Sequence, residues 1–87
     1  MDLIINGITF TYSKSPYKGD TDFWASPCIS RKGTSNWVQI SKNGDQFLVI
    51  SVQQFGYRDF VSGTDFRADS LDDAVSFIGR HFKWLCS

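Results

Sequence analysis

The amino-acid sequence predicts an α+β fold, an antiparallel β-meander of about five to six strands with one C-terminal helix packed on one face. Short β-prone runs alternate with turn residues over most of the chain, and only the segment after Asp69 has the apolar spacing of an amphipathic helix. A chain of 87 residues allows one modest core and one domain. We therefore expect a single domain, 1–87, in which one sheet face is left without a covering helix.

The first strand pair is predicted by Asn6-Gly7, which separates two β-prone runs, 3–5 and 8–12. Both residues tolerate the positive φ of a type I′ turn, so this dipeptide is a strong hairpin signal. Residues 13–22 have the composition of a loop. The run 23–31 is β-prone, but Pro27 lacks the backbone N–H of a strand ladder, which predicts an edge strand or a broken one.

A second hairpin is predicted where 37–42 and 46–53 flank Asn43-Gly44-Asp45. A two-residue turn and a three-residue turn with a Gly bulge are both compatible with this sequence. We prefer the three-residue turn, because it gathers the aliphatic residues on the face that the helix would cover. That face would carry Val38, Ile40, Leu48, Ile50 and Val52, and the opposite face Trp37, Gln39, Phe47, Val49 and Ser51.

The remaining β segments are a strand over 57–61, a turn over 62–65 and a short extended Phe66-Arg67. The helix begins after Ser70, which is a typical N-cap with Asp73 as the acid three residues later. Gly79 lies inside the helix, so either another element approaches it closely or the helix frays there. One apolar stripe is predicted from Leu71, Ala74, Val75, Ile78, Phe82 and Leu85.

The residue inventory argues against an enzyme and against a bound metal or cofactor. His81 is the only histidine, and no Glu is present. The two cysteines, Cys28 and Cys86, have neither a metal-ligand spacing nor a disulfide framework, and we expect Cys28 to be buried as a small hydrophobe. No Gly-rich phosphate loop precedes the helix. We expect no catalytic residues, no metal site and no cofactor.

The charge and hydropathy patterns bear on location and partners. The formal net charge is zero, which is unlike nucleic-acid binders that rely on a strong basic field. The longest apolar run, 47–50, is strand-sized and far shorter than a membrane span. A signal peptide needs a basic start and an apolar run, whereas this sequence starts with the acidic Asp2 and Asn6-Gly7 interrupts its first apolar run. We expect a chain in the cytoplasm of a bacterial host.

Aromatic residues are the positive functional signal, since they make up 16% of the chain. Tyr and Trp concentrate at interface hot spots because they bury a large area with few rotatable bonds. Several aromatic residues lie where the predicted core does not easily reach, and Arg58 and Asp59 add charge beside them on a hairpin end. The candidate partner-binding residues are Trp24, Trp37, Phe47, Phe55, Tyr57, Arg58 and Asp59.

The format of the chain resembles the small phage-encoded anti-CRISPR inhibitor proteins. The resemblance lies in the 37–53 hairpin and in the closing helix that begins Asp69-Ser70-Leu71-Asp72-Asp73. It covers most of the chain in format and includes no defining motif, so no functional residue is carried over. It implies stoichiometric binding to a CRISPR effector, which blocks target DNA binding or cleavage without catalysis. Many such inhibitors are strongly acidic, and this chain is neutral.

Two other hypotheses remain. A single-stranded nucleic-acid-binding module would stack bases on Trp37 and Phe47 and would contact phosphates with basic residues. Five of the nine basic residues lie between positions 14 and 42, namely Lys14, Lys18, Arg31, Lys32 and Lys42. The third hypothesis is a homodimer formed through the bare sheet face or an edge strand.

Overall fold

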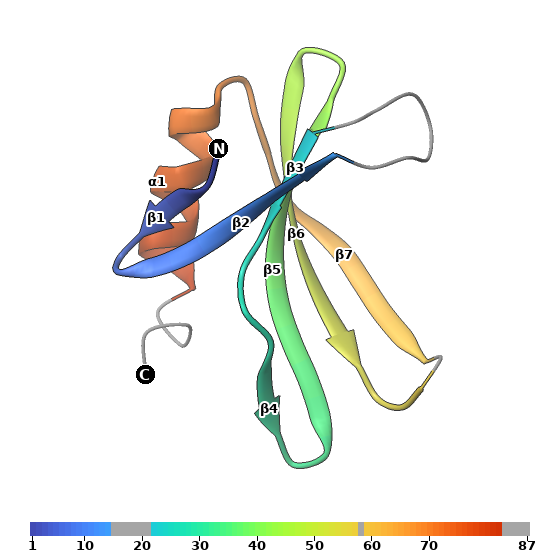
Figure 1. Cartoon of the computed structure of the whole chain (residues 1–87). Coiled ribbons are helices and arrows are strands. Elements are labelled where there is room, and N and C mark those ends of the chain that lie inside the picture. The colour runs from blue at the N-terminus through green and yellow to red at the C-terminus, as the bar shows by residue number, and fades with distance from the viewer. Residues whose placement is uncertain (15–21, 58, 83–87) are drawn as a thin grey trace.

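The structure, a computed structural model, describes residues 1–14, 22–57 and 59–82. Within them the chain forms seven strands and one C-terminal helix, as Figure 1 shows. The elements are β1 (Leu3–Ile5), β2 (Ile8–Lys14), β3 (Asp22–Ala25), β4 (Ile29–Arg31), β5 (Thr34–Asn43), β6 (Gln46–Gln54), β7 (Phe60–Ala68) and α1 (Leu71–His81). All strand pairs are antiparallel, so the predicted α+β class is confirmed.

The sheet curves around the helix. Its strand order is β1-β2-β3-β5-β6-β7, and β4 pairs with β5 outside this order. The helix contacts β6 and both end strands, β1 and β7. Figure 1 shows that the lower parts of β5, β6 and β7 extend past the C-terminal end of α1. One face of the sheet is therefore only partly covered, and the other face carries no helix in the described part of the chain.

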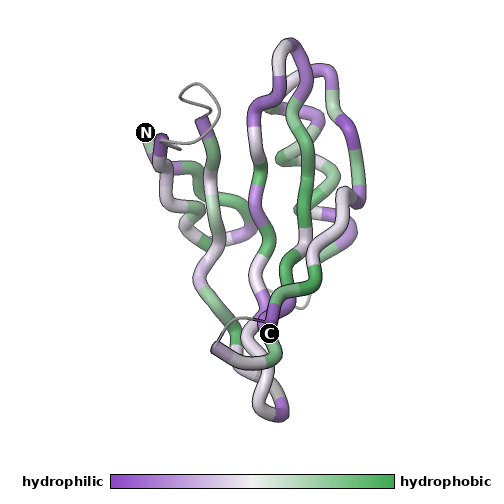
Figure 2. The backbone as a smooth tube through the Cα atoms, turned by 90° about the vertical axis from the view of Figure 1, so that its right-hand side faces the viewer, coloured by the Kyte–Doolittle hydropathy of each residue, from purple (hydrophilic) through white to green (hydrophobic). Residues whose placement is uncertain are grey.

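The core lies between α1 and the face of the sheet that it covers, which we call the helix side. The predicted apolar stripe of the helix is confirmed within the described residues, because Ala74 and Ile78 are buried and Leu71, Val75 and Phe82 pack around them. Leu85 lies outside those residues. Figure 2 shows hydrophobic stretches along the strands. The buried core residues are Ile5, Phe10, Trp24, Val38, Ile40, Val49, Ala68, Ala74 and Ile78.

The register of the β5–β6 hairpin corrects the sequence-based expectation. Asn43 pairs with Gln46, which leaves a two-residue turn, and Ile40 faces Val49 rather than Leu48. Gly44 takes the first turn position with a φ of 63°, the conformation that a type II′ turn needs there. Because side chains alternate between faces, this shift moves every side chain of β6 to the opposite face.

The faces of β6 are therefore exchanged relative to the prediction. Phe47, Val49 and Ser51 lie on the helix side. Leu48, Ile50 and Val52 lie on the other face, together with Trp37. Hydrophobic alternation does not select the register in this strand, because Phe47 to Ile50 is apolar on both faces, and turn geometry decides it.

The predicted break at Pro27 is confirmed. The chain leaves the ladder there, so the β-prone run becomes the separate strands β3 and β4. Ser26 holds the junction against β5. Its N–H donates to the carbonyl of Val38 at 2.9 Å, and its hydroxyl accepts from the N–H of Val38, also at 2.9 Å.

Two further expectations meet different outcomes near the C-terminus. The predicted turn over 62–65 is wrong: β7 runs through it to Ala68, with a register shift that leaves Asp65 as an extra residue. The N-cap is confirmed, because the hydroxyl of Ser70 accepts a 3.1 Å hydrogen bond from the N–H of Asp73.

Candidate protein-binding surface

Two of the candidate partner-binding residues belong to the core. Trp24 is 8% exposed, packs against Phe47 with ring centroids 6.4 Å apart, and donates its indole N–H to the carbonyl of Met1 at 2.9 Å. Phe47 is half-buried on the helix side, where it contacts the core cluster. The expectation that the core does not reach these two rings is therefore wrong, since β3 and β6 both turn them toward the helix side.

Trp37 does lie on the face without a helix, as predicted. Its ladder partner on β6 is Val52, and its ring meets Phe60 edge-on with centroids 6.2 Å apart. The indole N–H donates to the side chain of Gln39 at 3.3 Å, so this half-buried ring is fixed along β5. Trp37 is thus a neighbour of β7 and not of Phe47.

The largest group of exposed apolar side chains lies where β6 meets β7. The exposed fractions are 51% for Phe55, 91% for Tyr57, 54% for Phe60 and 59% for Val61. We call these four residues the hairpin patch. Exposed large apolar side chains that gather at one end of a hairpin are candidates for an interaction site.

Hydrogen bonds at this hairpin end hold the patch in place. The N–H of Phe55 donates to the carbonyl of Asp59 at 2.9 Å, and the side chain of Gln54 donates to the carbonyl of Gly56 at 2.9 Å. Tyr57 is therefore carried on a closed turn. Asp59 is exposed beside it, whereas Arg58 lies outside the described residues.

Phe60 and Val61 were not singled out from the sequence. They are consecutive in a strand, so their side chains point to opposite faces of the sheet. Two adjacent apolar residues in an edge strand would have indicated exposed apolar surface. The sequence shows the pair, but the strand order that makes β7 an edge is a tertiary property.

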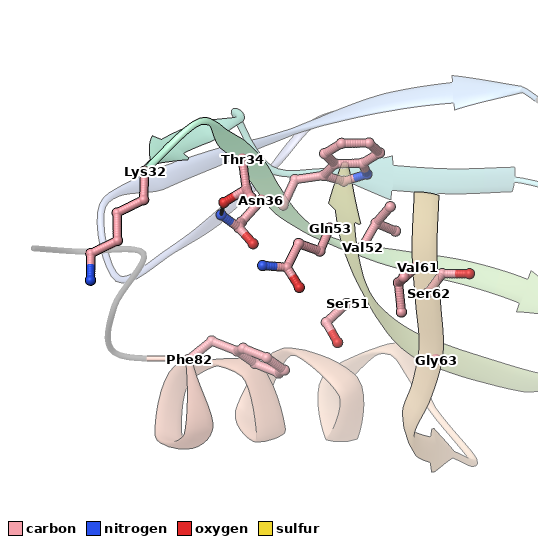
Figure 3. A pocket seen from close by; sticks show the side chains of 11 residues that line it. Lys32, Thr34, Asn36, Ser51, Val52, Gln53, Val61, Ser62, Gly63 and Phe82 are labelled. Atoms are coloured by element: carbon pink, nitrogen blue, oxygen red, sulfur yellow. Dashed lines mark hydrogen bonds between the residues drawn. The ribbon is translucent and has the colours of Figure 1, made fainter. Parts of the chain in front are cut away.

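A shallow groove adjoins the patch on the helix side. It has a volume of about 810 Å³ and lies beside the C-terminal end of α1, where Phe82 forms one wall (Figure 3). Gln53 and Ser51 present an amide and a hydroxyl to it, and neither side chain makes a hydrogen bond within the described residues. Val61 and Gly63 form the rim on β7.

The described residues include no group of three or more His, Cys, Asp or Glu side chains that could hold a metal ion. Cys28 is a free, exposed thiol, which corrects the expectation that it is buried. The ring of His81 stacks on Phe77 at 4.3 Å between centroids.

No protein-family model matches the chain, and neither the curated proteins nor the solved structures contain a match to it. The helix found in the described ranges is too short to cross a membrane.

Proposed function

We propose that this chain is a non-catalytic protein-binding module that holds its partner with the hairpin patch. The observation that carries the proposal is the gathering of Phe55, Tyr57, Phe60 and Val61 at one exposed hairpin end. Aromatic side chains supply much of the binding energy at protein interfaces, because they desolvate a large area at low entropic cost.

The neighbourhood of the patch supports a protein partner. Trp37 contacts Phe60, so the patch continues onto the sheet face that carries no helix in the described residues. Amide and hydroxyl groups border the patch through Gln53 and Ser51 in the groove. An apolar centre with a polar border is the usual anatomy of a protein–protein interface.

The test uses a photo-crosslinking amino acid, p-benzoylphenylalanine, in place of Tyr57. The matched control carries it in place of Ile4, which is 73% exposed on β1 at the other end of the sheet. In a bacterial lysate we expect one defined protein adduct from position 57 and none from position 4. Phe60→Ala should remove that adduct. The same set of adducts from both positions, or none from position 57, would contradict the proposal.

The finer proposal is that the partner is a bacterial CRISPR effector, blocked before target DNA binding or cleavage. Its support is the format resemblance described above. Purified effector should lose target cleavage when one equivalent of the chain is added, and Tyr57→Ala should restore cleavage. Unchanged cleavage at tenfold excess would contradict this partner class and would leave the crosslinking result standing.

The alternative function, single-stranded nucleic-acid binding, has no comparable support. It requires bases to stack on Trp37 and Phe47 together. The register places these rings on opposite faces of the sheet. We therefore do not propose it.

A further inference from the structure

One edge of the sheet is open. β7 pairs with β6 on one side only and is the last strand of the sheet within the described ranges. All side chains from Phe60 to Asp65 are exposed. The opposite edge, β1, has three residues, and the adjacent Asn6 is bonded to the helix. An exposed edge strand presents unpaired N–H and C=O groups, which can pair with a strand from another chain.

Only the C-terminal part of β7, from Asp65 onward, has the features that usually protect an edge strand from pairing. The extra residue at Asp65 interrupts the ladder, and Arg67 adds a second charge. From Phe60 to Thr64 the strand has no charged residue and no proline. Bulges and charges discourage edge pairing, so 60–64 is the segment available to an incoming strand.

The two faces of this segment offer contacts to alternate side chains of such a strand. Phe60 lies on the Trp37 side, and Val61 lies on the groove side. Gly63 is also on the groove side, and a Cβ built on it would meet nothing within 4 Å. A large side chain opposite Gly63 therefore has room to enter the groove.

Two carboxylates stand at the ends of the segment. Asp59 precedes it and Asp65 follows it; both are exposed, and neither forms an ion pair with another described residue. Opposite charges across strands stabilise pairing, and like charges destabilise it. If a second copy of this chain paired antiparallel with Ser62 opposite Ser62, Asp59 of each copy would lie next to Asp65 of the other. The charges favour a different strand, with a cation at each end.

We propose that residues 60–64 bind an extended segment of a partner protein as an additional antiparallel strand. The partner's strand has apolar side chains opposite Val61 and Gly63. It has a Lys or Arg at each end, beside Asp59 and Asp65. Main-chain hydrogen bonds supply the pairing, and the alternating side chains and terminal cations supply the selectivity. This inference rests on the proposed function, since it specifies how a partner engages the hairpin patch.

The probe is the capped peptide Lys-Thr-Leu-Thr-Val-Tyr-Lys, titrated into the labelled full chain while amide shifts are recorded by NMR. We expect saturable shifts at 60–65. A peptide with Glu in place of both Lys residues should bind roughly tenfold more weakly, because two cross-strand attractions become repulsions. Equal affinity of the two peptides would overturn the terminal-cation requirement.

Backbone methylation tests strand pairing itself. In an antiparallel pair, alternate amides of the incoming strand face its partner. N-methylation of one alternate set should abolish binding, whereas methylation of the other set should preserve it. If both methylated peptides bind as well as the parent, or if the parent peptide produces no shifts, strand addition is wrong. The crosslinking result at position 57 is independent of this outcome.

Gly63→Val tests the space on the groove side. A Cβ at this position meets no atom within 4 Å, so we expect the fold to stay intact, but the valine side chain occupies the room that the incoming side chain needs. We expect peptide affinity to fall at least about fivefold, with no change for Thr9→Val on β2. Unchanged affinity would overturn the assigned register. Sedimentation that shows a dimer dissolved by Gly63→Val would overturn the proposal in favour of a second copy.

Discussion

The side-chain amide of Asn6 donates a 3.0 Å hydrogen bond to the carbonyl of Gly79, across 73 residues of sequence. This contact ties the first hairpin turn to the last turns of the helix. Asn6 has a φ of 51° and Gly7 a φ of 81°, as the predicted type I′ turn requires. A Cβ built on Gly79 would lie 3.4 Å from the Asn6 amide nitrogen, so of the two explanations for a glycine in this helix, close approach is confirmed.

Asn6→Ala should destabilise the chain by about 1–2 kcal/mol. It removes the hydrogen bond to Gly79 and places alanine in the left-handed region, where Asn is better tolerated. Asn6→Gly is the matched control, because it removes the same hydrogen bond without the backbone strain. Chemical denaturation should rank the stabilities as wild type, then Asn6→Gly, then Asn6→Ala. Equal values for all three would contradict the contact.

Gly79→Ala should raise the free energy of unfolding by up to about 1 kcal/mol. Alanine is the better helix former, and its methyl group would make an ordinary van der Waals contact with Asn6. The melting temperature should rise by a few degrees. A decrease would mean that Asn6 does not yield to the added methyl group.

Ile78→Ala should cost about 2–5 kcal/mol, because Ile78 is 1% exposed at the centre of the core and its truncation leaves a cavity. Ser76→Ala, on the exposed side of the same helix, should change the melting temperature little. If Ile78→Ala melts within a degree or two of the parent, the helix does not pack as described.

Trp24→Ala and Trp37→Ala should separate the core from the uncovered face. Trp24→Ala should cost about 3–5 kcal/mol through lost burial and cavity formation. Trp37 is half-buried on one side only, so its replacement should cost clearly less in the same denaturation experiment. Equal losses would indicate a second small core around Trp37.

Stability should depend on the ionisation of Tyr12 at high pH. The Tyr12 hydroxyl donates a 2.5 Å hydrogen bond to the carboxylate of Asp22, which raises the pKa of Tyr12 above 10.0, and burial and the charge of Asp22 act in the same direction. The folded chain therefore keeps this proton to higher pH than the unfolded chain. The contribution is complete below the ordinary pKa and is lost as pH rises through the raised one.

The measurement compares the wild type with Tyr12→Phe. Above about pH 10 the unfolding free energy of the wild type should fall more steeply than that of the variant. Below that pH the difference between them should be constant. Parallel curves across the whole range would show that Tyr12 ionisation is not linked to folding.

The local features of the fold could be predicted from the sequence because their causes are local. Asn6-Gly7 specifies its turn through backbone conformation, Pro27 breaks its strand through a missing N–H, and Ser70 caps the helix with its own hydroxyl. The apolar spacing of α1 identified Ala74 and Ile78 as core residues for the same reason.

The candidate surface was predicted only in part. Phe55, Tyr57 and Asp59 are exposed at the predicted hairpin end, but the sequence also nominated Trp24 and Phe47, which pack in the core. The error at Phe47 came from the register of β6, where residues 47–50 are apolar on both faces and suit either orientation. Trp24 lies on β3, where its pairing with Ile40 puts it on the helix side.

What the sequence determined by itself was therefore the identity of most elements, and the tertiary structure decided which way their side chains point. A two-residue turn at Gly44 places Phe47 and Val49 on the helix side, and the order of the strands makes β7 an edge. The strand order depends on contacts between segments that are distant in sequence, and the register depends on which of two compatible turns forms. Local propensity is set within a few residues, whereas burial is shared among all the strands that meet the helix.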